Sequence, residues 1–306
     1  MFSRIRHLSN LGLFFLFTFN LFADIPNYID DGILLFQKGD YKEAKVCFQR
    51  LLERDCNNWK AIVYLGRIHF TENKLDEAEK LFQKAIAIEE NDSYNHFWLA
   101  VTYGEKAKNA GIFKAGSLAK KMKTSLLKSI ELDPDNIDAR DVLIQFYVSA
   151  PKIMGGSMDK AQEQADEINK RDPFKGLCSY GWIYSSKKNH EKALKNYLQA
   201  LELTKLDTSN LRKNEVEAGI NDLGYEMLSN GDTFKAIQVF QVNVENFPES
   251  LNVYDSLGEA YAKSGNKKLA ISFYRKAVEM NPRKTEWEKK MYESGVKQIE
   301  KLGGTI

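Results

Sequence analysis

Small and apolar residues recur along this chain at fixed spacings that predict pairs of short helices. The clearest stretch is residues 251–284, which has a proline, Pro282, two residues before its end. Its patterned positions are Tyr254, Leu257, Gly258, Tyr261, Gly265, Ala270, Tyr274, Ala277 and Pro282. Small side chains let two helices cross closely, tyrosines fill the remaining gaps, and proline ends the second helix. The pattern therefore predicts a helix–turn–helix repeat of 34 residues.

The same pattern returns along most of the chain. In five of the repeats a glycine is followed twelve residues later by an alanine, as in Gly66 and Ala78. The repeats cover residues 25–58, 59–92, 93–136, 137–175, 174–207, 217–250 and 251–284. A polar helix over residues 285–302 is expected to cap the last repeat against water.

This pattern resembles the tetratricopeptide repeat, which is a helical hairpin of 34 residues. The resemblance implies an all-α, right-handed solenoid of about seven hairpins over residues 24–306. Such a fold is stabilised by packing between neighbouring repeats rather than by one central core.

Two repeats are longer than the template. Residues 93–136 carry ten extra residues and residues 137–175 about five, and both insertions are expected between the first and second helix. Gly111, Gly116, Gly155 and Gly156 are expected to form flexible turns there. About ten further residues form a join over 205–214. The segment from Ala150-Pro151 through Gly155-Gly156-Ser157 resembles a family of exported bacterial tetratricopeptide repeat proteins with no assigned biochemical role.

The first 23 residues predict an export signal. They contain Arg4, Arg6 and no acid, followed by an apolar run from Leu11 to Ala23. The run is about a dozen residues, whereas a transmembrane helix needs about 20. We therefore expect a signal peptide and a periplasmic or secreted protein, with an uncleaved anchor as the alternative. No stable membrane span is expected once this segment is removed.

The net charge of +2 belongs entirely to this segment. The chain has 44 Lys+Arg and 42 Asp+Glu, so removing the two arginines leaves 42 of each sign. A neutral, exported chain makes nucleic acid an improbable partner. Residues 104–130 nevertheless contain seven lysines against one acid, Glu105. We predict a basic lip at the insertions for an anionic partner or a lipid headgroup, and its residues are Lys114, Lys120, Lys121, Lys123 and Lys152. The alternative is a helical hairpin whose lysines are only solvated.

The inner face of the solenoid predicts a second candidate site. Positions 2, 5, 9, 12 and 13 of each first helix line the groove in such folds. The predicted groove residues are Arg67, Phe70, Tyr94, Phe97, Gln145, Trp182 and Tyr225. Aromatic side chains with an occasional cation suit an extended peptide or a partner helix. The competing interpretation is that several of these side chains pack against neighbouring helices.

Catalytic motifs are weak. Ser117 and Ser157 each begin an S-x-x-K run, Ser250 begins an S-x-N run, and Lys263-Ser264-Gly265 resembles K-T-G. The last falls in a turn between helices, and Ser157 is better explained as a helix N-cap. Cys47 and Cys56 lie about 13 Å apart along a helix, too far for a disulfide. We predict no enzyme activity, no cofactor and no metal site.

These observations favour a non-enzymatic scaffold that binds a protein or peptide in the bacterial envelope. The alternative is an accessory subunit of a transport or envelope-assembly system that holds a ligand between the two insertions. The sequence does not fix the oligomeric state.

Overall fold

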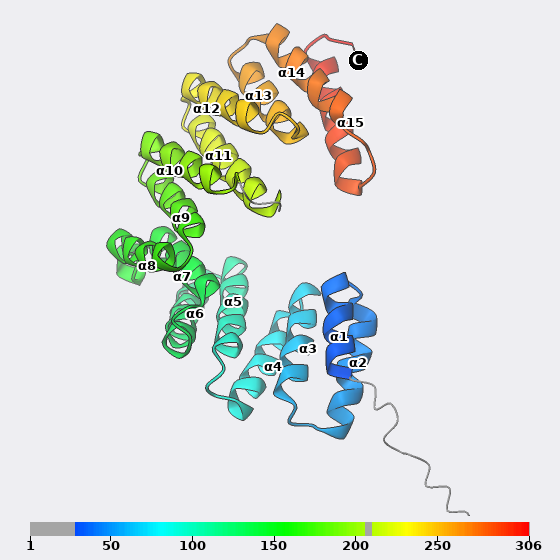
Figure 1. Cartoon of the computed structure of the whole chain (residues 1–306), viewed down its shortest axis with the longest axis vertical. Coiled ribbons are helices and arrows are strands. Elements are labelled where there is room, and N and C mark those ends of the chain that lie inside the picture. Colours follow the sequence, from blue (N-terminus) through cyan, green and yellow to red (C-terminus); the bar gives the residue numbers. More distant parts are fainter. Residues whose placement is uncertain (1–27, 206–209, 306) are drawn as a thin grey trace, which may run out of the picture. The chain divides into compact units, whose positions relative to one another are not determined.

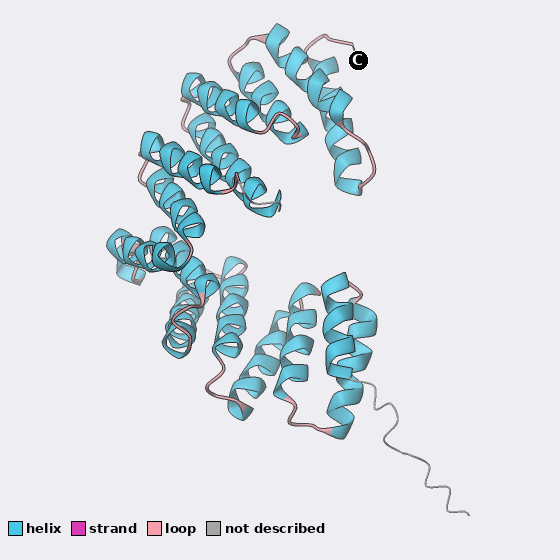
Figure 2. Cartoon of the chain, viewed as in Figure 1, coloured by secondary structure: helices cyan, strands magenta, loops and turns pink. Residues whose placement is uncertain are grey.

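The computed structural model describes residues 28–205 and 210–305. This part of the chain forms fifteen α-helices, one short 3-10 helix and no strand (Figure 2). The predicted all-α repeat fold is confirmed. The predicted export segment, residues 1–23, lies outside the described residues. Within the described ranges, no helix combines the length and the apolar content that a bilayer span requires.

Fourteen of these helices form seven consecutive antiparallel pairs (Figure 1). The pairs are α1 (Tyr28–Lys38) with α2 (Tyr41–Arg54), α3 (Trp59–Thr71) with α4 (Leu75–Ile88), α5 (Ser93–Lys108) with α6 (Ile112–Leu132), α7 (Ile137–Ser149) with α8 (Met158–Arg171), α9 (Pro173–Ser186) with α10 (His190–Leu203), α11 (Asn210–Ser229) with α12 (Thr233–Asn246), and α13 (Leu251–Lys263) with α14 (Lys267–Met280). The last helix is α15 (Glu286–Lys301), and the 3-10 helix η1 (Lys152–Met154) lies between α7 and α8.

In five of the seven pairs, the recurrent glycine of the first helix lies against an aromatic ring of the second helix. A Cβ atom at Gly66 would lie 2.8 Å from the ring of Phe82, and one at Gly224 would lie 2.5 Å from the ring of Phe240. The same contact joins Gly32 to Phe48, Gly181 to Tyr197 and Gly258 to Tyr274. The glycines are therefore explained by packing, because any side chain there would displace a buried ring.

The chain divides into two compact units, residues 28–90 and 91–305. In the first unit, Phe48, Leu65 and Ile68 form a core between α2 and α3. The second unit has a succession of cores along α5–α9, α9–α13 and α14–α15. Each core joins neighbouring helices, as expected for a repeat fold.

The first insertion lengthens the helices of its pair. Helix α6 has 21 residues against 14 in α4 or α8, and α5 and α6 are joined by only three residues. The prediction of a turn at Gly116 is wrong, because this residue lies inside α6. The extra residues propagate the helix, since the segment is rich in alanine, leucine and lysine, which all favour helices.

The second insertion is a turn that contains η1. Gly155 ends η1 with a left-handed φ of +96°. A Cβ atom at Gly156 would lie 1.8 Å from the carbonyl oxygen of Ala150. Both glycines are therefore required by the backbone path.

Part of the expected join is also helical. Helix α11 begins at Asn210 and has 20 residues, so residues 210–214 belong to it. At the other end of the second unit, Ile299 of α15 is fully buried against Tyr274 and Val278 of α14.

Candidate functional site

The predicted groove residues divide between the two units. Arg67 and Phe70 belong to α3 of the first unit. The guanidinium carbon of Arg67 lies 4.3 Å from the ring centroid of Phe36 and 5.0 Å from that of Tyr64. This cation therefore packs on aromatic rings of its own unit.

Tyr94 and Phe97 lie on α5, the first helix of the second unit. Their ring centroids are 6.2 Å apart, and Tyr94 also meets Trp98 edge-on at 5.9 Å. Phe97 is buried whereas 38% of Tyr94 is exposed. Phe97 is thus a core residue, and only Tyr94 offers its ring to a partner.

Gln145 and Trp182 line one cavity of about 380 Å³ between α7, α9 and α11. Its walls include three carboxylates that the sequence analysis did not single out, and these are Asp141, Glu215 and Asp222. Glu215 accepts a hydrogen bond from Lys175 Nζ at 2.7 Å. The cavity is therefore acidic, not purely aromatic.

Burial shapes the acidity of this inner surface. It raises the pKa of Asp141 to about 6, although a hydrogen bond from Ser179 Oγ at 3.1 Å partly opposes the shift. On α13, burial and the nearby Glu259 raise the pKa of Asp255 to about 6. Tyr225, the last predicted groove residue, donates to Glu259 Oε2 at 3.2 Å.

A sequence signal for these acids existed. Asp141 and Asp255 both occupy position 5 of their repeats, and Glu259 occupies position 9. These positions are expected to line the groove, so the acids at them are the sequence signal of an acidic inner surface.

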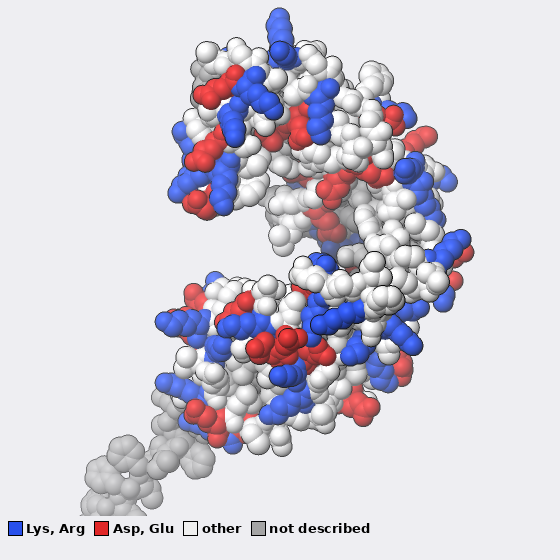
Figure 3. All heavy atoms as spheres, turned by 180° about the vertical axis from the view of Figure 1, so that it is seen from behind, with Lys and Arg blue, Asp and Glu red and all other residues white. Residues whose placement is uncertain are grey.

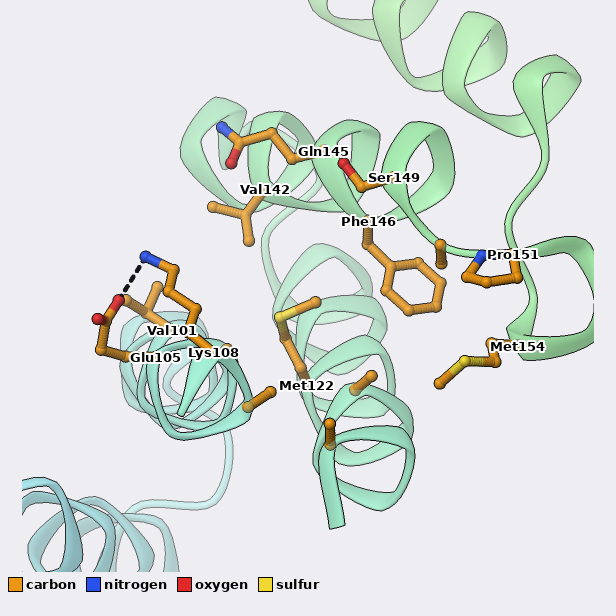
Figure 4. A pocket seen from close by; sticks show the side chains of 15 residues that line it. Val101, Glu105, Lys108, Met122, Val142, Gln145, Phe146, Ser149, Pro151 and Met154 are labelled. Carbon is orange, nitrogen blue, oxygen red and sulfur yellow. Dashed lines mark hydrogen bonds and ion pairs between the residues drawn. The ribbon is translucent and has the colours of Figure 1, made fainter. Parts of the chain in front are cut away.

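The two insertions together form a larger pocket of about 580 Å³ (Figure 4). Helix α5 forms one wall, α6 the floor, α7 another wall, and the turn after α7 closes the side. The lining residues are Val101, Gly104, Glu105, Ala107, Lys108, Ala115, Ala119, Met122, Val142, Gln145, Phe146, Ser149, Ala150, Pro151 and Met154. Most of these side chains are apolar, so the pocket suits an apolar group.

The insertions touch each other beside this pocket. A Cβ atom at Gly116 of α6 would lie 3.1 Å from Cε of Met154, which follows α7. Polar groups stand at the pocket edge, where Lys108 Nζ lies 2.6 Å from Glu105 Oε2 (Figure 4). Gln145 lines both this pocket and the acidic cavity, and it links the two hollows.

None of the five lysines of the predicted basic lip lines the pocket. Lys121 Nζ lies 5.3 Å from the ring centroid of Tyr103, and Lys123 Nζ lies 5.3 Å from that of Tyr147. Lys114, Lys120 and Lys152 are exposed and make no ion pair with any described residue. The lip is thus a charged border on a long helix and a turn.

The weak catalytic motifs have structural roles. Ser157 is the N-cap of α8, where its side chain accepts a hydrogen bond from the Lys160 amide. Ser264 and Gly265 lie in the turn between α13 and α14. Cys47, Cys56 and Cys178 are unpaired. In residues 28–205 and 210–305, no cluster of His, Cys, Asp or Glu has an arrangement that could hold a metal ion.

Family comparisons agree with the fold. Models described as tetratricopeptide repeat match residues 35–96, 174–205 and 251–284. The chain is similar to a CTR9 homolog of Arabidopsis thaliana, with 23% identity over 84% of this chain and 26% of the relative. It is also similar to the mouse Superkiller complex protein 3, with 24% identity over 88% of this chain and 16% of the relative. The chain therefore spans about a quarter or less of these relatives.

Solved structures show the same architecture. A tetratricopeptide repeat protein from Parabacteroides merdae superposes with a TM-score of 0.56 at 16% identity, covering 88% of this chain and 97% of that one. The APC/C hetero-tetramer Cut9–Hcn1 gives a TM-score of 0.55 at 14% identity, covering 89% of this chain and 49% of that one. At these identities the likeness concerns the fold alone. The chain is an all-α repeat protein that carries tetratricopeptide repeats.

Proposed function

We propose that this chain is a non-enzymatic scaffold that binds a protein or peptide through the second unit. Tetratricopeptide repeats generally serve as non-catalytic interaction scaffolds, and the fold is suited to protein binding. The observation that carries the proposal is the apolar pocket between the two insertions.

The pocket has the size and lining of a side-chain receptor. Its volume of about 580 Å³ falls within the range of about 300–1,000 Å³ for ligand pockets. Met122 and Met154 border it from two sides, and flexible thioethers adapt to different apolar shapes. We infer that a large apolar side chain of the partner enters here while its backbone follows the inner faces of α5 and α7.

We further propose that residues 1–23 export the chain, so that binding takes place in the periplasm or outside the cell. The basic start and short apolar run support this. Fusing residues 1–30 to a reporter that is active only after export tests it. Reporter activity that survives deletion of residues 11–23 would refute it. Cleaved signal and retained anchor are then distinguished by the N-terminal sequence of the exported protein.

A ligand-holding accessory subunit is the second candidate, because the same pocket lies between the insertions. The scaffold and the accessory subunit are distinguished by which added molecule raises the melting temperature of the chain. A small apolar ligand that binds the folded state should stabilise the chain in a ligand-dependent manner. A peptide scaffold should show this effect only with its peptide partner.

Two neighbouring positions on α6 provide the test of the pocket. Ala115 lines it, whereas Ser117 is exposed and does not. The full chain is used as bait to capture proteins from an envelope extract. Ala115→Trp should fill the pocket and weaken recovery of a specifically captured protein by about tenfold or more. Ser117→Trp adds the same ring on the outer face and should leave recovery unchanged. Equal recovery by both variants, with unchanged helical content, would exclude the pocket as the binding site.

A further inference from the structure

The two insertions expose large apolar side chains to water. Phe113 is 96% exposed, Ile153 95% and Ile112 85%, which are the highest values for large hydrophobic residues in the described part of the chain. Single exposed apolar residues are ordinary on protein surfaces. Three on two adjoining segments call for a physical explanation.

These side chains lie at one edge of the second unit. Ile112 and Phe113 form the first turn of α6, and Ile153 belongs to η1. Gly116 lies one helical turn after Ile112 and faces Met154, the residue next to Ile153. The close approach of Gly116 and Met154 therefore brings both apolar ends together.

The segments that carry these apolar residues are basic. Residues 106–130 and 142–158 contain no acid, and their lysines are Lys106, Lys108, Lys114, Lys120, Lys121, Lys123, Lys128 and Lys152. Lys108 and Lys128 form ion pairs with Glu105 and Glu131. Lys114 and Lys152 directly adjoin Phe113 and Ile153 in the sequence, so each projecting apolar residue has a cation beside it.

We propose that this edge docks on an anionic lipid bilayer. Apolar side chains that project from the surface can enter the boundary between headgroups and acyl chains. Neighbouring lysines then bind the negative headgroups while their aliphatic stems stay in apolar surroundings. The surface is independent of the occupant of the pocket, so this proposal goes beyond the scaffold function.

The chain contains a matched control for this surface. Phe113-Lys114-Ala115 in α6 is repeated as Phe234-Lys235-Ala236 in the first turn of α12. Phe234 is 73% exposed, but Lys235 Nζ lies 3.3 Å from Asp232 Oδ2. The same tripeptide thus occurs once at the basic edge and once beside an acid.

Tryptophan fluorescence at these two sites tests the proposal. The full chain carrying Phe113→Trp or Phe234→Trp is mixed with vesicles of phosphatidylcholine alone or phosphatidylcholine with phosphatidylglycerol, including brominated acyl chains. We expect quenching and a blue shift for F113W only with phosphatidylglycerol, and neither for F234W. Residues 1–27 are the same in both variants, so any lipid binding by them cannot create this difference.

A second set of variants tests the charge requirement. Lys114→Glu, Lys120→Glu and Lys152→Glu combined in the F113W chain should lower vesicle partitioning by at least about tenfold. Circular dichroism checks that the helical content is kept. The proposal is overturned if F113W is not quenched by either vesicle, as for a surface that contacts only protein. It is also overturned if both sites are quenched equally or if charge reversal has no effect.

Discussion

Gly224 illustrates how a single residue sets the distance between two paired helices, here α11 and α12. A Cβ atom at this position would lie 2.5 Å from Cε1 and 2.6 Å from Cζ of Phe240, whose ring is fully buried. Overpacking of this kind costs about 1–3 kcal/mol, and the helix propensity of alanine returns about 1 kcal/mol. We expect Gly224→Ala to lower the free energy of unfolding by up to about 2 kcal/mol in urea titrations. Gly111→Ala is the control, because nothing lies within 4 Å of its Cβ position.

Partly buried carboxylates on the inner surface predict a dependence of stability on pH. The pKa of Asp255 is raised to about 6 by burial. Between about pH 4 and pH 6 the folded chain keeps a proton that the unfolded chain releases, so stability falls as pH rises through this window. Above about pH 6 the loss in the free energy of unfolding no longer changes with pH. Asp255→Asn removes the charge and should stabilise the chain by about 1–2 kcal/mol at neutral pH, with little gain near pH 4.

Thermal melting at the two pH values measures this effect. Asp159→Asn, which changes an exposed carboxylate, should shift the melting temperature little at either pH. An equal gain for Asp255→Asn at both pH values would show that its charge is not the cause.

At the scale of the helix, the 34-residue pattern predicted the paired helices because its glycines and aromatics report directly on packing. The insertions were harder to predict, since residues 112–118 match no position of the 34-residue pattern, and only their helix propensity indicates from the sequence that they belong to α6. The pocket was missed for a related reason. Its lining includes Ala115, Met122 and Met154. Apolar residues of these types are common in helices, so their positions in the sequence do not indicate a pocket.

The terminal helix α15 depends on the residues that begin it. Thr285 Oγ1 accepts from the Glu288 amide at 3.1 Å, and Glu288 Oε2 accepts from the Thr285 amide at 2.8 Å. This reciprocal arrangement satisfies amides that the first helical turn cannot pair. Thr285→Ala should destabilise α15 by about 1 kcal/mol and increase hydrogen exchange at its amides. Asp40→Ala changes an N-cap whose side chain makes no cap hydrogen bond. Hydrogen exchange in α2 should therefore increase less than hydrogen exchange in α15 does in Thr285→Ala. An equal response of the two helices would contradict this role of Thr285.

For the whole molecule, a neutral total charge conceals a local imbalance. Acidic and basic side chains are interspersed over the face drawn in Figure 3. The insertions depart from this mixture, because residues 106–130 and 142–158 contain lysines and no acid. The inner surface of α7, α11 and α13 instead carries acidic side chains, which are Asp141, Asp222 and Asp255. The second unit therefore carries surfaces of opposite charge.

The repeat fold also predicts that damage stays local. Each helix packs mainly on its neighbours, so a cavity destabilises adjacent repeats more than distant ones. Phe48 is fully buried in the first unit and stacks on Tyr64 with ring centroids 5.1 Å apart. Phe48→Ala should cost about 3–5 kcal/mol locally. Hydrogen exchange should then increase in α1–α4 and stay unchanged in α13–α15, whereas Tyr274→Ala should give the reverse pattern. A uniform increase over all helices in either variant would mean that the chain unfolds as one cooperative body, and packing between neighbours would not explain its stability.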